Sequence, residues 1–172
     1  MILIISLCTK KHPVFFDEFV KPIADCITEP HEVAHYTEKF DSEKYSKIIL
    51  CGTALKDDEY LKHLDKFEWL KDTKKPVLGI CAGMQVIARV NGAEIHEAKE
   101  IGFTNISSDH VLLKNTKEVY CLHHLAVECP KGFKKIAESD ICLQSIQKDK
   151  IIGLLFHPEV NNKHLIRTFI EQ

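Results

Sequence analysis

One segment limits the possible folds more than any other, and it occupies residues 76–92 with the sequence PVLGICAGMQVIARVNG. An apolar run of strand length ends at Cys81, and apolar residues at helical spacing follow at once. The helix is expected to stop at Asn91 and Gly92, which form a typical C-terminal cap. A buried strand that turns directly into a helix is typical of α/β proteins with a parallel sheet.

The order of the remaining segments supports this class. Residues 1–7, 32–36, 47–52 and 76–80 are expected as strands, and residues 13–27, 57–73 and 83–92 carry apolar side chains at helical spacing. Turn residues then separate short segments with β signals, namely 100–106, 110–114, 118–127, 134–139, 141–147 and 151–156, before a closing helix at 161–172. We therefore predict one domain over residues 1–172. Its expected fold is three-layer and flavodoxin-like, with helices on both faces of a mostly parallel sheet and an added antiparallel β region.

Charge and cysteine content exclude several functional classes. The net charge is −2, so no basic field indicates a nucleic-acid partner, and no apolar run is long enough to predict a membrane span. The apolar start, residues 1–7, lacks the features of a signal peptide and is expected to be a buried strand. Seven cysteines at irregular spacing, with no CxxC pair, indicate free thiols in a reducing, cytoplasmic compartment.

The cysteine in GICAG has the G-x-nucleophile-x-G form of a nucleophile elbow. Small residues at Gly79 and Gly83 permit so tight a turn. The helix N-terminus would stabilise a thiolate at Cys81, and the Ala82 N–H would point to where a substrate oxyanion forms. The alternative interpretation is a buried cysteine in an ordinary strand-to-helix turn.

A cysteine nucleophile requires a base, and one histidine is distinctive among ten. His157 directly follows the apolar strand at 151–156, and Pro158 fixes the backbone behind it. Glu159, two residues on, can orient the imidazole and hold its tautomer. The alternative is a strand that ends in a polar turn.

The segment at residues 121–124, CLHH, contains residue types that can bind a metal, and Cys129 follows nearby. Adjacent histidines on a strand point to opposite faces, so His123 and His124 are not expected to share a metal. We predict no metal and no cofactor.

The motifs GICAGMQ and FHPEV together resemble the two signatures of the class I (triad-type) glutamine amidotransferases, and their details are most similar to the glutaminase part of GMP synthetase. The resemblance is strong at residues 76–95 and 153–170 and weak over the first 45 residues. It implies hydrolysis of the side-chain amide of glutamine. The ammonia would pass to a separate ATP-dependent synthetase, such as GMP synthetase, because a chain of this length has no room for one.

The resemblance also implies residue roles. Cys81 matches the nucleophile, His157 the general base and acid, and Glu159 the residue that orients His157. The oxyanion hole falls on Ala82, Gly52 and Thr53, and the glutamine-binding positions on Gln85, Leu122, His124 and Leu125.

This chain departs from the family pattern in its loops. The family's SGGP loop is CGTA at residues 51–54, and the β-branched Thr53 resists the peptide flip that would donate its N–H. The family's SHGDEV-like segment is LHHLAV at residues 122–127, without its acidic residue. These changes keep two alternatives open: a stand-alone hydrolase of the same fold acting on another γ-glutamyl or amide substrate, and a catalytically silent regulatory or binding module.

Overall fold

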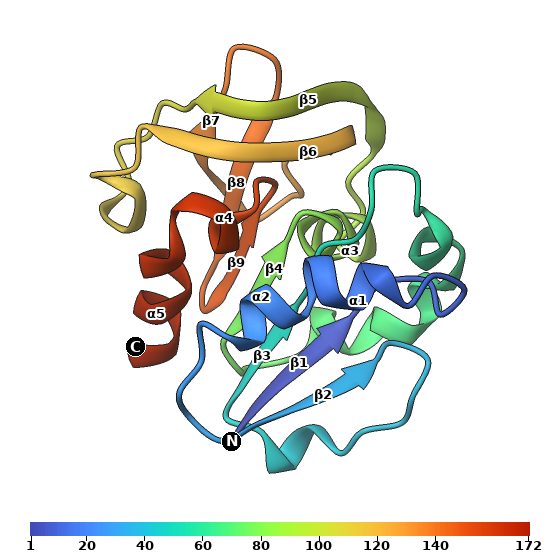
Figure 1. Ribbon diagram of the computed structural model, residues 1–172. Coiled ribbons are helices and arrows are strands. Elements are labelled where there is room, and N and C mark those ends of the chain that lie inside the picture. The colour runs from blue at the N-terminus through green and yellow to red at the C-terminus, as the bar shows by residue number, and fades with distance from the viewer.

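The chain is described by a computed structural model of residues 1–172, and its centre is a mostly parallel seven-stranded sheet (Figure 1). The strand order is β2-β1-β3-β4-β9-β8-β7, and a separate antiparallel ribbon pairs β5 with β6. The predicted fold class is confirmed. The parallel strands are β1 (Ile2–Ser6), β2 (His31–His35), β3 (Lys47–Leu50), β4 (Val77–Ile80) and β9 (Ile151–Leu154). The antiparallel ones are β5 (Ile95–Asn105), β6 (Glu118–Val127), β7 (Lys134–Glu138) and β8 (Leu143–Lys148).

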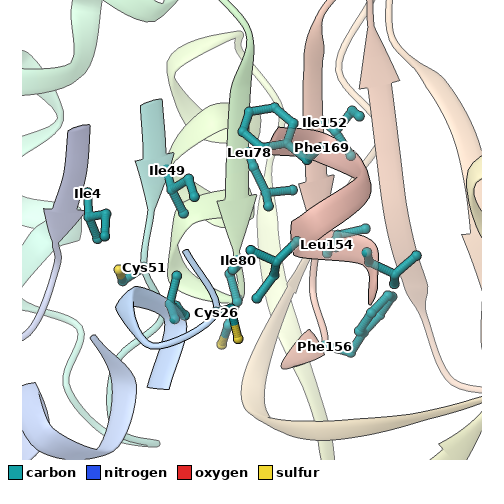
Figure 2. Packing of buried hydrophobic residues seen from close by; sticks show 14 of the residues in the cluster. Ile4, Cys26, Ile49, Cys51, Leu78, Ile80, Ile152, Leu154, Phe156 and Phe169 are labelled. Atoms are coloured by element: carbon teal, nitrogen blue, oxygen red, sulfur yellow. The ribbon is translucent and has the colours of Figure 1, made fainter. Parts of the chain in front are cut away.

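Helices cover both faces of the sheet because successive strand side chains point to opposite sides. In β1, Ile2 and Ile4 pack into one core cluster, whereas Leu3 and Ile5 pack into the other. The first cluster lies under α1 (Val14–Phe19), α2 (Lys21–Ala24) and α5 (Lys163–Glu171), and Figure 2 shows part of it. The second lies under η2 (Glu59–Lys71) and α3 (Ala82–Val90). No helix in the chain combines the length and apolar character needed to cross a lipid bilayer.

Two predicted helices have a different form. The single helix expected at residues 13–27 is broken at Val20 into α1 and α2, because Pro22 in the first turn of α2 cannot continue a helix from α1. The amphipathic α-helix expected at 57–73 is η2, a 3₁₀ element whose backbone leaves helical values at His63. Its apolar residues Tyr60, Phe67 and Leu70 are still buried.

Three further segments differ from expectation. Residues 110–114, expected as a strand, form the turn η3 (Val111–Leu113), because His110 Nδ1 accepts the Leu112 N–H and caps it. Strand β5 begins at Ile95, earlier than predicted. The closing helix is preceded by one separate turn, α4 (Pro158–Asn161). One more short turn, η1 (Ser42–Lys44), precedes β3.

The sheet topology brings three chain segments to one place. Strands β3, β4 and β9 are parallel neighbours, so their carboxyl ends lie side by side. Gly52 follows β3, Cys81 follows β4, and His157 follows β9 by a short extension. The carboxyl edge of a parallel sheet is where α/β proteins form their sites.

Candidate active site

Cys81 lies on a sharp turn between β4 and α3. Its φ is +50° and its ψ −105°, a conformation that non-glycine residues rarely adopt. Its N–H donates to Leu154 O of β9 at 2.7 Å. A Cβ at Gly79 would lie 2.6 Å from the carbonyl carbon of Gly83, so the turn closes backbone against backbone. The strand–turn–helix geometry expected of an elbow is therefore present, with the sulfur at the start of a helix.

His157 is held from both sides at the end of the β9 segment. Its N–H donates to Tyr120 O at 2.8 Å, and its Nδ1–H donates to Glu159 Oε1 at 2.7 Å. The side chains of His157 and Glu159 are only 2% and 3% exposed. The bond to Glu159 fixes the tautomer, so Nε2 is left as the free nitrogen, and it has no hydrogen-bond partner.

Gly52 lies against the side chains of both Cys81 and His157. A Cβ on Gly52 would lie 2.7 Å from His157 Cε1 and 3.3 Å from Cys81 Cβ, so only a glycine leaves the two side chains room to meet. Burial by itself would lower the pKa of His157. The Glu159 carboxylate and the Cys81 sulfur outweigh it and hold the pKa of His157 well above its usual value.

Two of the expected oxyanion-hole residues, Ala82 and Thr53, line the same small cavity as Cys81. Ala82 is the first residue of α3, where N–H groups lack partners within the helix. The Gly52 carbonyl accepts the Cys8 thiol at 3.6 Å, and a trans peptide then directs the Thr53 N–H away from Cys8. The Thr53 hydroxyl donates to Asp57 Oδ2 at 2.5 Å, which anchors this loop.

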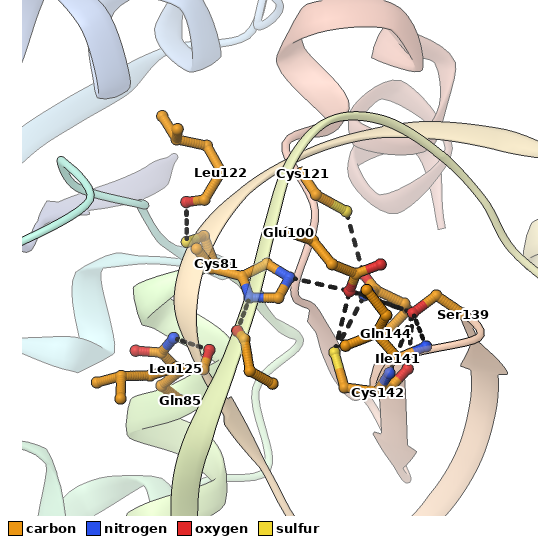
Figure 3. A network of polar contacts seen from close by, with 12 residues as sticks. Cys81, Gln85, Glu100, Cys121, Leu122, Leu125, Ser139, Ile141, Cys142 and Gln144 are labelled. Atoms are coloured by element: carbon orange, nitrogen blue, oxygen red, sulfur yellow. Dashed lines mark hydrogen bonds and ion pairs between the residues drawn. The ribbon is translucent and has the colours of Figure 1, made fainter.

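The residues expected to bind glutamine are engaged with one another. Gln85 Nε2 donates to Leu125 O at 2.9 Å, and Gln85 Oε1 accepts the Tyr60 hydroxyl. Leu122 O accepts the Cys81 thiol at 3.7 Å (Figure 3). The nitrogen and the oxygen of the Gln85 side chain thus each have a partner inside the protein.

His124 closes the same region from the ribbon. Its Nε2 lies 3.1 Å from both carboxylate oxygens of Asp58, which follows the Thr53 loop. The cavity between this loop, α3 and β6 has only about 10 Å³ of space for solvent, roughly one water molecule. His123 points to the opposite face of β6, where Nδ1 contacts Ala98 O. The described conformation is therefore closed to a substrate of amino-acid size.

Sequence reasoning missed three residues of this region. Asp57 and Asp58 anchor the loop, and Tyr60 contacts Gln85. The sequence pattern places Tyr60 only in an apolar helix stripe. Two acidic residues directly after a loop at a strand end are the signal that could have indicated anchoring groups.

These observations define a class. The chain is a three-layer α/β protein with a thiol on an elbow, beside a buried histidine–glutamate pair at the carboxyl edge of its parallel sheet.

Comparison with known proteins gives the family. The sequence pattern of the family described as glutamine amidotransferase class-I matches residues 15–172, and the chain belongs to this family. It is 39% identical over 135 residues to one subunit of the glutamine-hydrolyzing GMP synthase of Methanocaldococcus jannaschii, covering 72% of this chain and 70% of the relative. It is 45% identical over 96 residues to the glutamine-hydrolyzing GMP synthase of Campylobacter hominis. That match covers 49% of this chain but only 19% of the relative, so the chain spans a small part of that longer protein.

A solved structure from Thermoplasma acidophilum, described as a GMP synthase subunit protein, superposes with a TM-score of 0.78 at 25% identity. The superposition covers 99% of this chain and 93% of that one.

Proposed function

We propose that this chain hydrolyses the side-chain amide of glutamine and supplies the ammonia to a separate ATP-dependent synthetase. The observation that carries the proposal is the Cys81 elbow next to the buried pair of His157 and Glu159. Membership of the amidotransferase family and the names of the relatives support the choice of substrate and partner.

The proposed chemistry has two halves. The Cys81 thiolate attacks the amide carbon, and the His157 imidazolium gives its proton to nitrogen as the C–N bond breaks, which leaves ammonia and a γ-glutamyl thioester. His157 Nε2 then takes a proton from water, whose oxygen attacks the thioester and expels the Cys81 sulfur with glutamate as product. Glu159 stays ionised and holds the imidazole.

The oxyanion would be stabilised by the Ala82 N–H and by an N–H of the loop at Gly52 and Thr53. Each such donor is worth about 10²–10³ in rate. Gln85, Leu122, His124 and Leu125 would line the substrate site once it opens. The closed cavity supports a resting state that needs a partner or substrate to open it.

The test is steady-state release of glutamate from glutamine by the purified chain, alone and with a GMP-type synthetase in its nucleotide-bound state. We expect slow hydrolysis by the chain alone and activation by up to about 10²–10³-fold with the partner. Cys81→Ala is the control that must abolish both rates. Full activity of the isolated chain would instead favour the stand-alone hydrolase, and a silent chain under every condition would favour the binding module.

Thr53 is the residue we expect to limit the basal rate. Its β-branch and its bond to Asp57 hold the loop in one conformation. Thr53→Gly should raise glutamate release in the absence of the partner and reduce the activation that the partner gives. Thr73→Gly, at a loop position outside the cavity, is the control. A basal rate unchanged in Thr53→Gly would exclude this loop as the gate.

A further inference from the structure

A second cluster of reactive side chains lies behind β6, on the face opposite to His124. Glu100 of β5, His123 of β6 and Cys142, which precedes β8, place a carboxylate oxygen, an imidazole nitrogen and a sulfur within 4.8 Å of one another. The side chains of His123 and Glu100 are 1% and 3% exposed, and Cys142 is 9% exposed. The chemistry proposed for Cys81 uses none of these groups.

The two nitrogens of His123 impose a specific requirement. Nδ1 lies 3.0 Å from Ala98 O, which can only accept, so Nδ1 carries a proton. Nε2 of the neutral ring is then a lone pair, and it faces Glu100 Oε2 at 3.3 Å without a hydrogen-bond partner. Glu100 Oε2 accepts from Ser139, Cys142 and Gln144, so His123 Nε2 is the buried atom left unsatisfied, and a proton or a metal ion would satisfy it.

The surroundings favour the metal ion. The Cys142 thiol lies 3.1 Å from the same Glu100 Oε2 that lies 3.3 Å from His123 Nε2, so oxygen, nitrogen and sulfur atoms converge on one buried point. A divalent cation at this point would accept the imidazole lone pair and stabilise the thiolate.

We propose that Glu100, His123 and Cys142 form a structural zinc site in which Cys142 binds as the thiolate and releases its proton to solvent. Zinc accepts nitrogen, oxygen and sulfur ligands in one tetrahedral shell, whereas magnesium and calcium select oxygen. The separations of 3.1 and 3.3 Å are close to the edges of about 3.3–3.6 Å of a tetrahedron with zinc–ligand bonds of about 2.0–2.3 Å. The Ser139 hydroxyl lies 3.1 Å from Glu100 Oε2 and offers an oxygen for the fourth position, and the Gln144 amide donates to Glu100 Oε2 and orients this carboxylate. The Ala98 carbonyl would orient the histidine ligand from behind.

This site would link the antiparallel pair of β5 and β6 to the seven-stranded sheet. Its ligands come from β5, from β6 and from the segment leading into β8, and Figure 3 shows the contacts around Glu100. Strand β6 also presents Leu122 O to Cys81 and Leu125 O to Gln85. Zinc binding would therefore fix the part of the backbone that faces the proposed nucleophile.

The experiment measures metal binding directly, so it does not depend on glutamine turnover. The full chain is treated with a chelator, titrated with Zn²⁺ against a competing chromophoric chelator, and checked for metal content by mass spectrometry. Co²⁺ serves as a second probe, because a cobalt–thiolate bond gives a charge-transfer absorption band. We expect one zinc per chain and a cobalt–thiolate band.

Matched variants locate the site. Cys142→Ala and Glu100→Gln should each weaken zinc binding by about tenfold or more, and Cys142→Ala should remove the cobalt–thiolate band. Cys129→Ala and Glu97→Gln, a thiol and a β5 carboxylate outside the cluster, should bind zinc as the wild type does. A folded wild type that binds neither metal would overturn the proposal. So would equal binding by Cys142→Ala, or equal loss in Cys129→Ala. Two variants that remove different ligands keep the test valid if one of them does not fold.

Discussion

Residues that share a chemical type differ widely in this chain because their surroundings differ. Burial raises the pKa of six of the seven cysteines, and the pKa of Cys121 rises to about 12. The other five are Cys8, Cys26, Cys51, Cys129 and Cys142. Cys81 is the one that lies at the N-terminus of a helix and faces a histidine–glutamate pair. Position in the fold therefore sets Cys81 apart from the other six cysteines and supports its assignment as the proposed nucleophile.

The first prediction concerns selective labelling. A glutamine-like electrophile at neutral pH should alkylate Cys81 faster than any other cysteine, because Cys81 lies at a helix N-terminus beside His157 whereas burial raises the pKa of the other six thiols. Peptide mapping after limited reaction measures this. Faster reaction at Cys8, Cys51 or Cys121 would contradict the assignment.

The second prediction concerns pH. The raised pKa of His157 keeps the imidazolium available above pH 6.5, and it is lost only as pH rises through the raised value. Glu159→Gln removes the carboxylate that raises this pKa, so the alkaline limb of the kcat/KM profile should move to lower pH. His157→Ala should abolish hydrolysis, whereas Glu159→Gln should retain a measurable rate. An alkaline limb at the same pH in Glu159→Gln and wild type would show that Glu159 does not set the pKa of His157.

At the scale of secondary-structure elements, side-chain contacts hold one loop closed over the candidate site. The loop between β3 and η2 is tied down by Asp57, which accepts from Thr53 and from the Thr9 N–H, and by the Asp58–His124 ion pair. The side chains of His124 and Asp58 are 32% and 40% exposed, so their contact is a weak latch of about 1 kcal/mol or less. A weak latch suits a loop that would have to open to admit the proposed substrate.

The third prediction tests that latch. Asp58→Ala should lower the KM for glutamine by up to about fivefold with kcat unchanged, because the open conformation becomes more populated. Asp65→Ala, an exposed acidic residue on η2, is the matched control. A higher KM in Asp58→Ala would mean that Asp58 binds substrate rather than restraining the loop.

Elements also show what the sequence could predict. The elbow was predictable because Gly79, Cys81 and Gly83 lie within five residues. A side chain at either glycine would clash with the neighbouring backbone, so the glycines themselves indicate the tight turn. The pairing of His157 with Glu159 was equally local. The form of η2 was not, because an apolar stripe does not distinguish 3₁₀ from α geometry. The Glu100–His123–Cys142 cluster was also missed, because its residues come from β5, β6 and the segment before β8, and no sequence spacing indicates that these segments meet.

At the scale of the whole molecule, the seven-stranded sheet has a hydrophobic core cluster on each face and the candidate active site at its carboxyl edge. Phe156 is completely buried in the first core and directly precedes His157. Its packing therefore contributes to folding and to the position of the proposed base at once.

The fourth prediction follows from this dual role. Phe156→Ala should lower the free energy of unfolding by about 3–5 kcal/mol, as deletion of a buried aromatic ring does. Phe103→Ala, whose side chain is 61% exposed on the ribbon, should cost less than about 1 kcal/mol. Urea unfolding followed by circular dichroism measures both. Similar losses in the two variants would show that the buried site relaxes around the missing ring.

The position of β9 inside the sheet, between β4 and β8, has a consequence for biosynthesis. Strand β9 pairs with β4, yet it is synthesised more than seventy residues after it. At translation speeds of about 5–20 residues per second, Cys81 exists for roughly 4 to 15 seconds before His157 is made. A ribosome-bound chain thus carries the thiol without its proposed base, in a half-built sheet whose β4 edge is still unpaired. The proposed hydrolysis is therefore expected only once the last parallel strand is in place.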